Sequence, residues 1–106
     1  MFISPFQEIL TEAIKKQLMI ELRYKDDVSH RIFHPYWLYV SNPGNTIMGG
    51  WQERNPNKGE NNIYHKFELR FVKDMVLTQN QFDIQTGFPI TRPKDCFRLI
   101  CGLNGY

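Results

Sequence analysis

The sequence predicts a small, mainly β fold, in which a strongly bent antiparallel sheet closes into a barrel with a helix before it and a short helix after it. Three observations predict this class. Several short segments alternate apolar and polar residues, as half-buried strands do. These segments follow one another too closely for the crossovers that parallel strands need. The length of 106 residues suits a single domain, residues 1–106, with one modest core.

The first expected element is a helix from Pro5 to about Gln17. Ser4 can cap this helix, Pro5 suits its first position, and Gln7 completes a capping box. Apolar residues then recur at helical spacing on one face, namely Phe6, Leu10, Ala13 and Ile14.

The strands expected after this helix are residues 18–25, 30–40, 46–51, 63–71 and 75–78. Pro35 interrupts the second strand, and Gly49-Gly50 marks a bulge or bend in the third. Residues 42–45 form a turn, and residues 53–62 form a loop without aliphatic or aromatic side chains. The clean alternation predicts that Ile20 and Leu22 share one core with Phe67 and Leu69.

The C-terminal part is expected to hold a linker, residues 89–93, and a short helix, residues 94–101, that stops at Gly102. Cys96 and Cys101 are expected to be free thiols, because their spacing on a helix places them on different sides.

Charge and hydropathy exclude several classes. The formal charge is +2, and the 13 Lys and Arg residues are dispersed, so no polybasic tract indicates nucleic-acid binding. No apolar run has the length of a membrane-spanning helix, and the N-terminus lacks a signal-peptide layout. A cytoplasmic protein with no membrane contact is the expectation.

A series of short motifs extends from about Ile9 to Leu103. In order these are Ala13-Ile14, Tyr24, Arg31, His34-Pro35, Phe67 with Leu69, Phe82, and Phe97 to Gly102. In order and spacing, this series resembles the WYL domain, found mostly in bacterial transcription regulators. The resemblance implies an Sm-like or SH3-like barrel. It also implies that the domain senses an anionic or nucleic-acid ligand and passes the signal to a helix-turn-helix domain.

The chain departs from the family at three places. The tripeptide that names the family, Trp-Tyr-Leu, is replaced by Thr46-Ile47-Met48. The Asp-Arg pair of the family is replaced by Arg70-Phe71, which removes the Arg thought to face the ligand. The basic residue two positions before Phe67 is His65 rather than Arg.

Candidate ligand-binding residues are Arg31, His34 and His65, with Tyr24 and Arg70 at the rim. The Arg fork can bind two oxygens of a phosphate or carboxylate. Histidines that gain protons toward about pH 6 would strengthen anion binding. The alternatives are that His65 is a core histidine and that Arg31 is a solvated charge on an edge strand. Arg31 also alternates with the face of His34, so one of the two should be exposed unless Pro35 twists the strand.

Other groups are weaker candidates for a function. Trp37, Tyr39 and Trp51 could stack on nucleic-acid bases, but such residues are more often core or dimer contacts. His30 and His34 have ligand-like spacing, yet no further ligand accompanies them, so neither a metal nor another cofactor is expected.

The resulting hypothesis is a non-catalytic domain of a WYL-type transcription regulator that senses a small ligand or nucleic acid. No Gly-rich phosphate loop or nucleophile arrangement indicates an enzyme. Expected partners are a nucleic acid or nucleotide-like anion, a helix-turn-helix domain or other regulator, and a second copy of the chain. The alternative is a protein-interaction or dimerisation module with a vestigial ligand pocket, and a hydrolase or nuclease is a weaker third reading.

Overall fold

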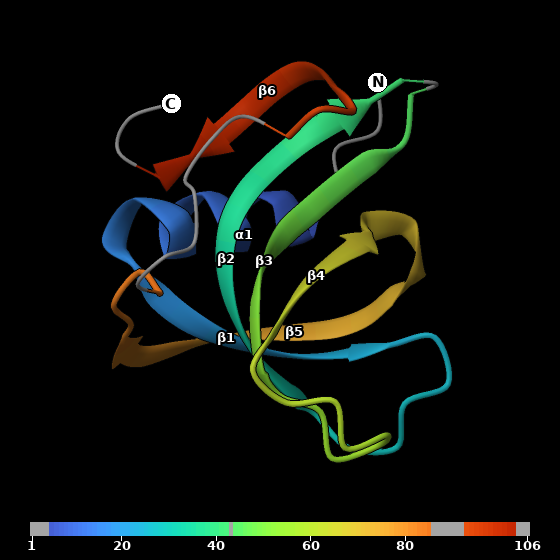
Figure 1. The fold of residues 1–106 in the computed structure, drawn as a ribbon, viewed down its shortest axis with the longest axis vertical. Coiled ribbons are helices and arrows are strands. Elements are labelled where there is room, and N and C mark those ends of the chain that lie inside the picture. Colours follow the sequence, from blue (N-terminus) through green and yellow to red (C-terminus); the bar gives the residue numbers. More distant parts are fainter. Residues whose placement is uncertain (1–4, 43, 86–92, 104–106) are drawn as a thin grey trace.

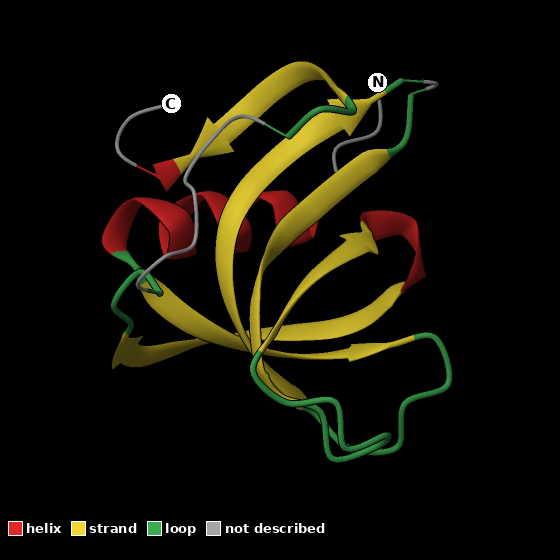
Figure 2. Ribbon diagram, in the orientation of Figure 1, coloured by secondary structure: helices red, strands yellow, loops and turns green. Residues whose placement is uncertain are grey.

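The computed structural model describes residues 5–42, 44–85 and 93–103. In this part of the chain, one helix is followed by six strands, with a single turn of 3₁₀ helix between the fourth and fifth (Figures 1 and 2). The elements are α1 (Pro5–Lys16), β1 (Leu18–Tyr24), β2 (Arg31–Ser41), β3 (Thr46–Arg54), β4 (Ile63–Glu68), η1 (Leu69–Phe71), β5 (Val72–Gln81) and β6 (Cys96–Gly102). The mainly β class and the N-terminal helix are confirmed.

Helix α1 has nearly the predicted bounds and buries the predicted face. Leu10, Ala13 and Ile14 are all buried under the sheet. The helix ends at Lys16, and Gln17 adopts a left-handed conformation (φ 52°) that turns the chain directly into β1. Ser4, the predicted cap, lies outside the described residues.

All strand pairs are antiparallel, in the order β4-β3-β2-β1-β5. Strand β2 is long and bent, and two strands share one of its edges. Its first half pairs with β1, as in Ile20↔Phe33, and its second half pairs with β6, as in Leu38↔Cys101. The predicted interruption at Pro35 is confirmed, since the register with β3 shifts between Pro35 and Trp37.

Two expectations about the sheet are wrong, namely that it closes into a barrel and that residues 63–71 form one strand. Within the described residues, β4 and β5 stand at opposite ends of the strand order, so the sheet is open rather than a closed barrel. The reason lies at η1, where the predicted strand 63–71 stops at Glu68 and the chain turns. Strand β5 then pairs with β1 along most of its length, from Tyr24↔Val72 to Leu18↔Gln81.

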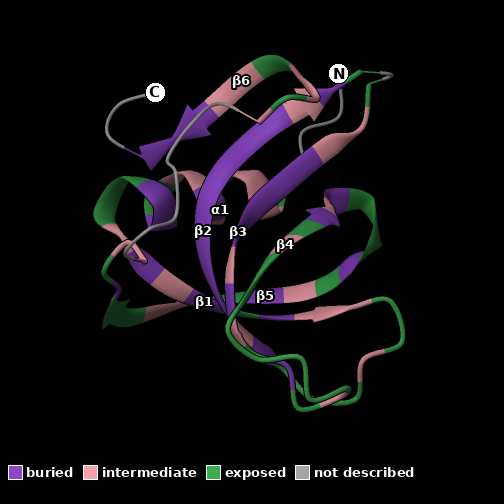
Figure 3. Ribbon diagram, viewed as in Figure 1, coloured by how far each residue is buried: buried purple, intermediate pink, exposed green. Residues whose placement is uncertain are grey.

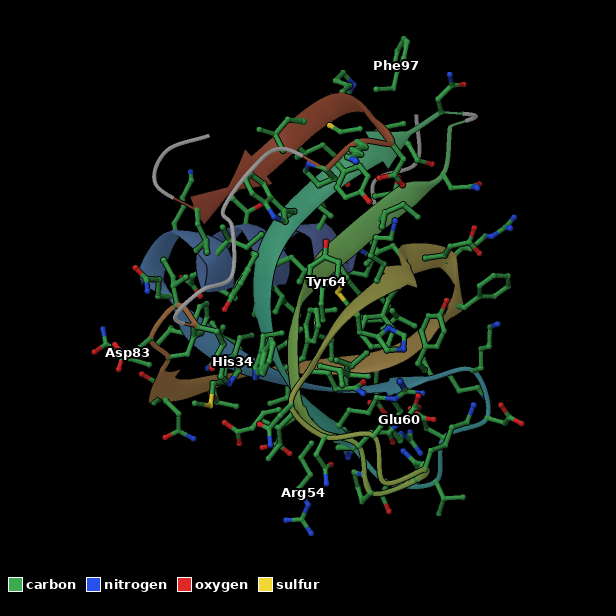
Figure 4. The ribbon with its side chains drawn as sticks, viewed as in Figure 1. His34, Arg54, Glu60, Tyr64, Asp83 and Phe97 are labelled. Carbon is green, nitrogen blue, oxygen red and sulfur yellow. The ribbon has the colours of Figure 1, made fainter. Side chains whose placement is uncertain are left out.

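The predicted C-terminal helix is also wrong, because this segment forms β6. Strand β1 leaves the edge of β2 after Phe33, and the backbone groups of β2 from Trp37 onward need another partner. The segment Cys96–Gly102 supplies those hydrogen bonds. Phe97 projects from β6 into solvent, 71% exposed (Figure 4). Most of the predicted linker, residues 89–92, lies outside the described residues.

The core lies between α1 and the concave face of the sheet (Figure 3). The four residues predicted to share it, Ile20, Leu22, Phe67 and Leu69, are all buried in one cluster. Trp37 and Tyr39 also belong to this cluster, which confirms the interpretation that these two rings are part of the core.

Candidate functional site

Three of the five predicted ligand-binding residues meet at one end of the sheet. Tyr24 ends β1, Arg31 begins β2, and His65 lies on β4. They line a hollow of about 200 Å³, which we call the Arg31 hollow. Its other lining residues come from the β1–β2 turn and the β3–β4 loop, namely Lys25, Asp26, Asp27, Lys58 and Glu60.

The Arg31 guanidinium is held by the Asp27 carboxylate. Its Nε lies 2.6 Å from Oδ2 and its Nη2 lies 3.0 Å from Oδ1, while Nη1 donates to Gln52 Oε1 at 3.1 Å. The two charged side chains are only 5% and 6% exposed. The guanidinium carbon also lies 5.7 Å from the Tyr24 ring centroid and 5.2 Å from that of Phe67. The alternative, that Arg31 is a solvated charge on an edge strand, is therefore wrong.

Opposing effects set the ionisation of Asp27. Burial by itself raises the pKa of this carboxyl group. The hydrogen bonds from Arg31 and from the Tyr24 backbone N–H, with the positive charges of Arg31 and Lys58, outweigh burial and lower the pKa. Asp27 is therefore an anion at neutral pH and completes a buried ion pair.

Tyr24 lies at the boundary between core and hollow. Its hydroxyl accepts the Glu68 backbone N–H at 3.1 Å, and its ring meets Phe67 edge-on at 4.8 Å between centroids. Burial is the main reason that the pKa of the Tyr24 phenol is raised, so the hydroxyl stays neutral.

His65 is half-buried, with its ring stacked on Phe67 at 4.4 Å between centroids. Its Nδ1 lies 2.9 Å from the Lys66 carbonyl oxygen. A carbonyl can only accept, so Nδ1 carries the proton and Nε2 is the atom that gains one on acidification. Burial is the main cause that lowers the pKa of His65, and the charges of Arg31 and Lys58 act in the same direction.

His34 does not reach the Arg31 hollow. It lies three positions after Arg31 on β2, and an odd spacing places the two side chains on opposite faces. Both are nonetheless buried, which corrects the expectation that one of them is exposed. His34 stacks on Phe82 at 4.8 Å and bonds Glu53 Oε1 through Nε2 at 3.1 Å. Figure 4 shows His34 on the side of the molecule that carries Asp83, whereas Glu60, which lines the Arg31 hollow, lies away from it on the β3–β4 loop.

Arg70 is also separate from the Arg31 hollow. Its side chain is 64% exposed, 3.4 Å from Glu68 Oε2, and packs over the Phe71 ring at 4.7 Å. It lines a different hollow of about 440 Å³, between the start of α1, the β2–β3 turn and η1. Of the three predicted residues that line the Arg31 hollow, Tyr24, Arg31 and His65, only Arg31 carries a permanent charge.

Asn57 joins the two loops that border the Arg31 hollow. Its Oδ1 accepts the backbone N–H groups of Val28 at 3.0 Å and Ser29 at 2.9 Å, and its Nδ2 donates to the Ser29 carbonyl at 2.9 Å. Figure 1 shows the β1–β2 turn and the β3–β4 loop lying together at the lower right. Asn57 thereby holds residues 55–62 against residues 25–30.

Sequence reasoning missed Asp27 and Asn57. Asp27 stands four residues before Arg31, but only the turn between the strands directs its carboxylate back to the guanidinium. The Asn-rich loop offered a weak signal for Asn57, because Asn side chains often bond nearby backbone groups.

The charge of the lining is balanced. Three basic and three acidic side chains border the Arg31 hollow: Lys25, Arg31 and Lys58, and Asp26, Asp27 and Glu60. Such a lining suits a small polar ligand and provides little excess positive charge.

The described residues offer no sign of a metal centre or a membrane span. No group of three or more His, Cys, Asp or Glu side chains that could hold a metal ion occurs in residues 5–42, 44–85 and 93–103. His30 instead pairs with Asp74, at 2.9 Å. The described part of the chain also contains no helix with the length and apolar character to cross a membrane.

Comparisons with protein-family models, with curated proteins and with solved structures each found no match to this chain.

Proposed function

We propose that this chain is a non-catalytic sensing domain of a WYL-type transcription regulator, which binds a small anion in the Arg31 hollow. The observation that supports this function is the convergence of Tyr24, Arg31 and His65, which come from three different strands. The chemical class is a nucleotide or another phosphate-bearing molecule, including an exposed segment of nucleic acid.

The local chemistry supports binding rather than reaction. Arg31 provides a fork for two oxygens, and Lys25 and Lys58 are exposed basic groups at the rim. The rings of Tyr24 and His65 provide flat walls against which a base or sugar can pack. Cytoplasmic regulators that sense metabolites need such a site but no catalytic group.

A second candidate function is a protein-interaction or dimerisation module with a vestigial pocket. The ion pair between Arg31 and Asp27 favours it, because the strongest anion-binding group is already paired. The exposed Phe97 ring on β6 also favours it, since large exposed aromatic side chains are common at interfaces.

The proposal is tested by titrating AMP and a short labelled oligothymidine into the protein, with fluorescence anisotropy or calorimetry as the measurement. Lys58→Ala should weaken binding severalfold, whereas Lys15→Ala, which removes the same charge from an exposed position on α1, should not. Because few phosphates are neutralised, affinity for the oligonucleotide should fall only shallowly with salt.

Acid pH gives a further readout. The lowered pKa of His65 places its protonation below the ordinary value of about 6.5, so binding should strengthen only as the pH falls below that value. His65→Gln should remove this strengthening. Absence of binding by both ligands at both about pH 5.5 and about pH 8 would reject the sensing function and favour the interaction module.

A further inference from the structure

The turn between β1 and β2 places a carboxylate where an anionic ligand would bind. Asp27 presents both oxygens to the Arg31 fork, with Nε–Oδ2 at 2.6 Å and Nη2–Oδ1 at 3.0 Å. A third donor points to the same place, since the Tyr24 backbone N–H bonds Asp27 Oδ2 at 2.9 Å. Two guanidinium N–H groups and one amide N–H therefore converge on a single oxyanion.

We infer that Asp27 is a built-in competitor for the Arg31 hollow, and that the ligand is a compact phosphate or carboxylate that displaces it. This inference rests on the proposed function and adds how the site is regulated. A displacing oxyanion takes over the same three donors, so Arg31 is never left buried without a partner. The Lys58 charge, which already acts on Asp27, attracts the incoming anion as well.

The position of Asp27 in the chain allows this exchange. It lies on the turn, residues 25–30, rather than on a strand, and the neighbouring Asp26 and Val28 side chains are exposed. Val28 is 86% exposed, so the turn packs little apolar surface that would resist movement. Arg31, by contrast, is fixed on β2, where its guanidinium lies over the rings of Tyr24 and Phe67. Asp27 is thus the partner that can move, whereas Arg31 is fixed.

Displacement of Asp27 has a structural consequence outside the hollow. The residues that follow Asp27, Val28 and Ser29, give their backbone N–H groups to Asn57. Movement of the turn therefore strains or breaks these bonds and releases residues 55–62 from residues 25–30. Ligand binding therefore changes how residues 25–30 and residues 55–62 lie against each other.

The size of the hollow limits the ligand. A volume of about 200 Å³ admits an oxyanion with a small organic group, but not a folded nucleic acid. Inorganic phosphate, AMP and acetate separate the sources of this chemistry: phosphate alone, phosphate on a nucleoside, and carboxylate alone.

The first arm of the test uses ¹⁵N NMR on the wild-type chain. Titration with inorganic phosphate, AMP or acetate should shift the Arg31 Nε–H signal and the Asn57 side-chain amide together. Sodium chloride at matched ionic strength is the control and should leave both unchanged. A shift of Arg31 without Asn57 would overturn the coupling between the turn and the loop.

The second arm compares Asp27→Asn with Asp26→Asn. Each removes one negative charge from the lining of the same hollow, but only Asp27 is bonded to Arg31. The amide introduced by Asp27→Asn keeps an oxygen for the Tyr24 N–H and lacks the charge that competes with the ligand. We expect Asp27→Asn to bind AMP at least about tenfold more tightly than wild type, and Asp26→Asn to gain no more than about threefold.

The outcomes separate the two proposals. If wild type binds and Asp27→Asn binds equally, the competitor role is overturned and the sensing function stands. If only Asp27→Asn binds, Asp27 occupies the hollow but no ligand displaces it, so the displacement and the sensing function of the wild-type chain both fail. If neither binds, both fail. Should Asp27→Asn not fold, as judged by circular dichroism, the wild-type NMR titration decides, because unchanged Arg31 and Asn57 signals overturn the inference.

Discussion

Gly50 on β3 lies directly against the carbonyl group of His34 on β2, at the point where Pro35 shifts the register. A Cβ atom on Gly50 would overlap the His34 carbonyl oxygen and would lie 2.9 Å from the Tyr36 backbone nitrogen. These are backbone atoms of the strand that organises the whole sheet, and they cannot rotate away. The bend of β2 therefore depends on the absence of a side chain at position 50.

Gly50→Ala should destabilise the fold by about 3 kcal/mol or more, because β2 and β3 must separate to admit the methyl group. Gly49→Ala is the matched control. There the added Cβ meets the Tyr64 hydroxyl at 2.6 Å, which is the end of a side chain that can move. Urea unfolding should show a loss for Gly49→Ala of no more than about 1 kcal/mol. Equal losses for both variants would contradict the steric argument.

Stability should fall as the pH is lowered through the histidine range. Burial is the main cause that lowers the pKa of His34, and the bond to Glu53 offsets only part of it. Its Nε2 donates to Glu53, so a second proton must go to Nδ1, which is buried without a hydrogen-bond partner among the described residues. The unfolded chain therefore binds this proton more readily than the folded chain.

The direction in which the free energy of unfolding changes with pH follows from the linkage between folding and proton binding. Between about pH 6.5, where histidine titrates in the unfolded chain, and the lower pKa values of folded His34 and His65, the unfolded state holds more protons. The free energy of unfolding should thus decrease as the pH falls through about 6.5, with a slope of at most about 1.4 kcal/mol per pH unit for each histidine. His34→Gln should reduce the slope. Ring-proton NMR titrations that gave either histidine a pKa above about 6.5 would contradict this.

Leu69→Ala should destabilise the protein by about 2–5 kcal/mol. Leu69 is 5% exposed in η1 and belongs to the main core cluster, so truncation leaves a cavity. Val76→Ala removes apolar carbon atoms from a side chain that is 53% exposed, and should cost less than about 1 kcal/mol. Thermal or urea unfolding of the two variants checks the contrast, and a loss below about 1 kcal/mol for Leu69→Ala would show that this site is not well packed.

The two cysteines should react with thiol reagents at different rates. Both are free, and Cys101 is 5% exposed whereas Cys96 is half-buried. Burial is the main cause that raises the pKa of the Cys101 thiol, which lowers its thiolate fraction at neutral pH. Native protein should therefore show one faster and one slower reaction, and unfolded protein two fast ones. A mass loss corresponding to a disulfide after non-reducing isolation would contradict the free-thiol assignment.

Elements that depend on local pattern were predictable from the sequence. The start and buried face of α1 follow from Pro5 and the helical spacing of Leu10 and Ile14. The period-two alternation predicted β1 and the burial of Phe67, and β2 ends and β3 begins on either side of the predicted turn. These patterns act over a few residues, so each segment specifies its own conformation.

The tertiary structure decided what depends on distant partners. The segment 94–101 has the composition of a short amphipathic helix, but the unpaired edge of β2 makes it strand β6. The order of strands, the open ends at β4 and β5, and the sharing of one β2 edge by β1 and β6 are likewise set by pairing between residues far apart in the chain.

The candidate site divides in the same way. The residue types of Tyr24, Arg31 and His65 could be selected from the sequence, because their chemistry suits an anion. The odd spacing of Arg31 and His34 already placed them on opposite faces of β2, but the stacking of His34 on Phe82, and the bond from Arg31 to Asp27, emerged only when turn and strands were in place. Local periodicity fixes which face a side chain occupies, whereas the partner it meets there depends on segments that only the folded chain brings together.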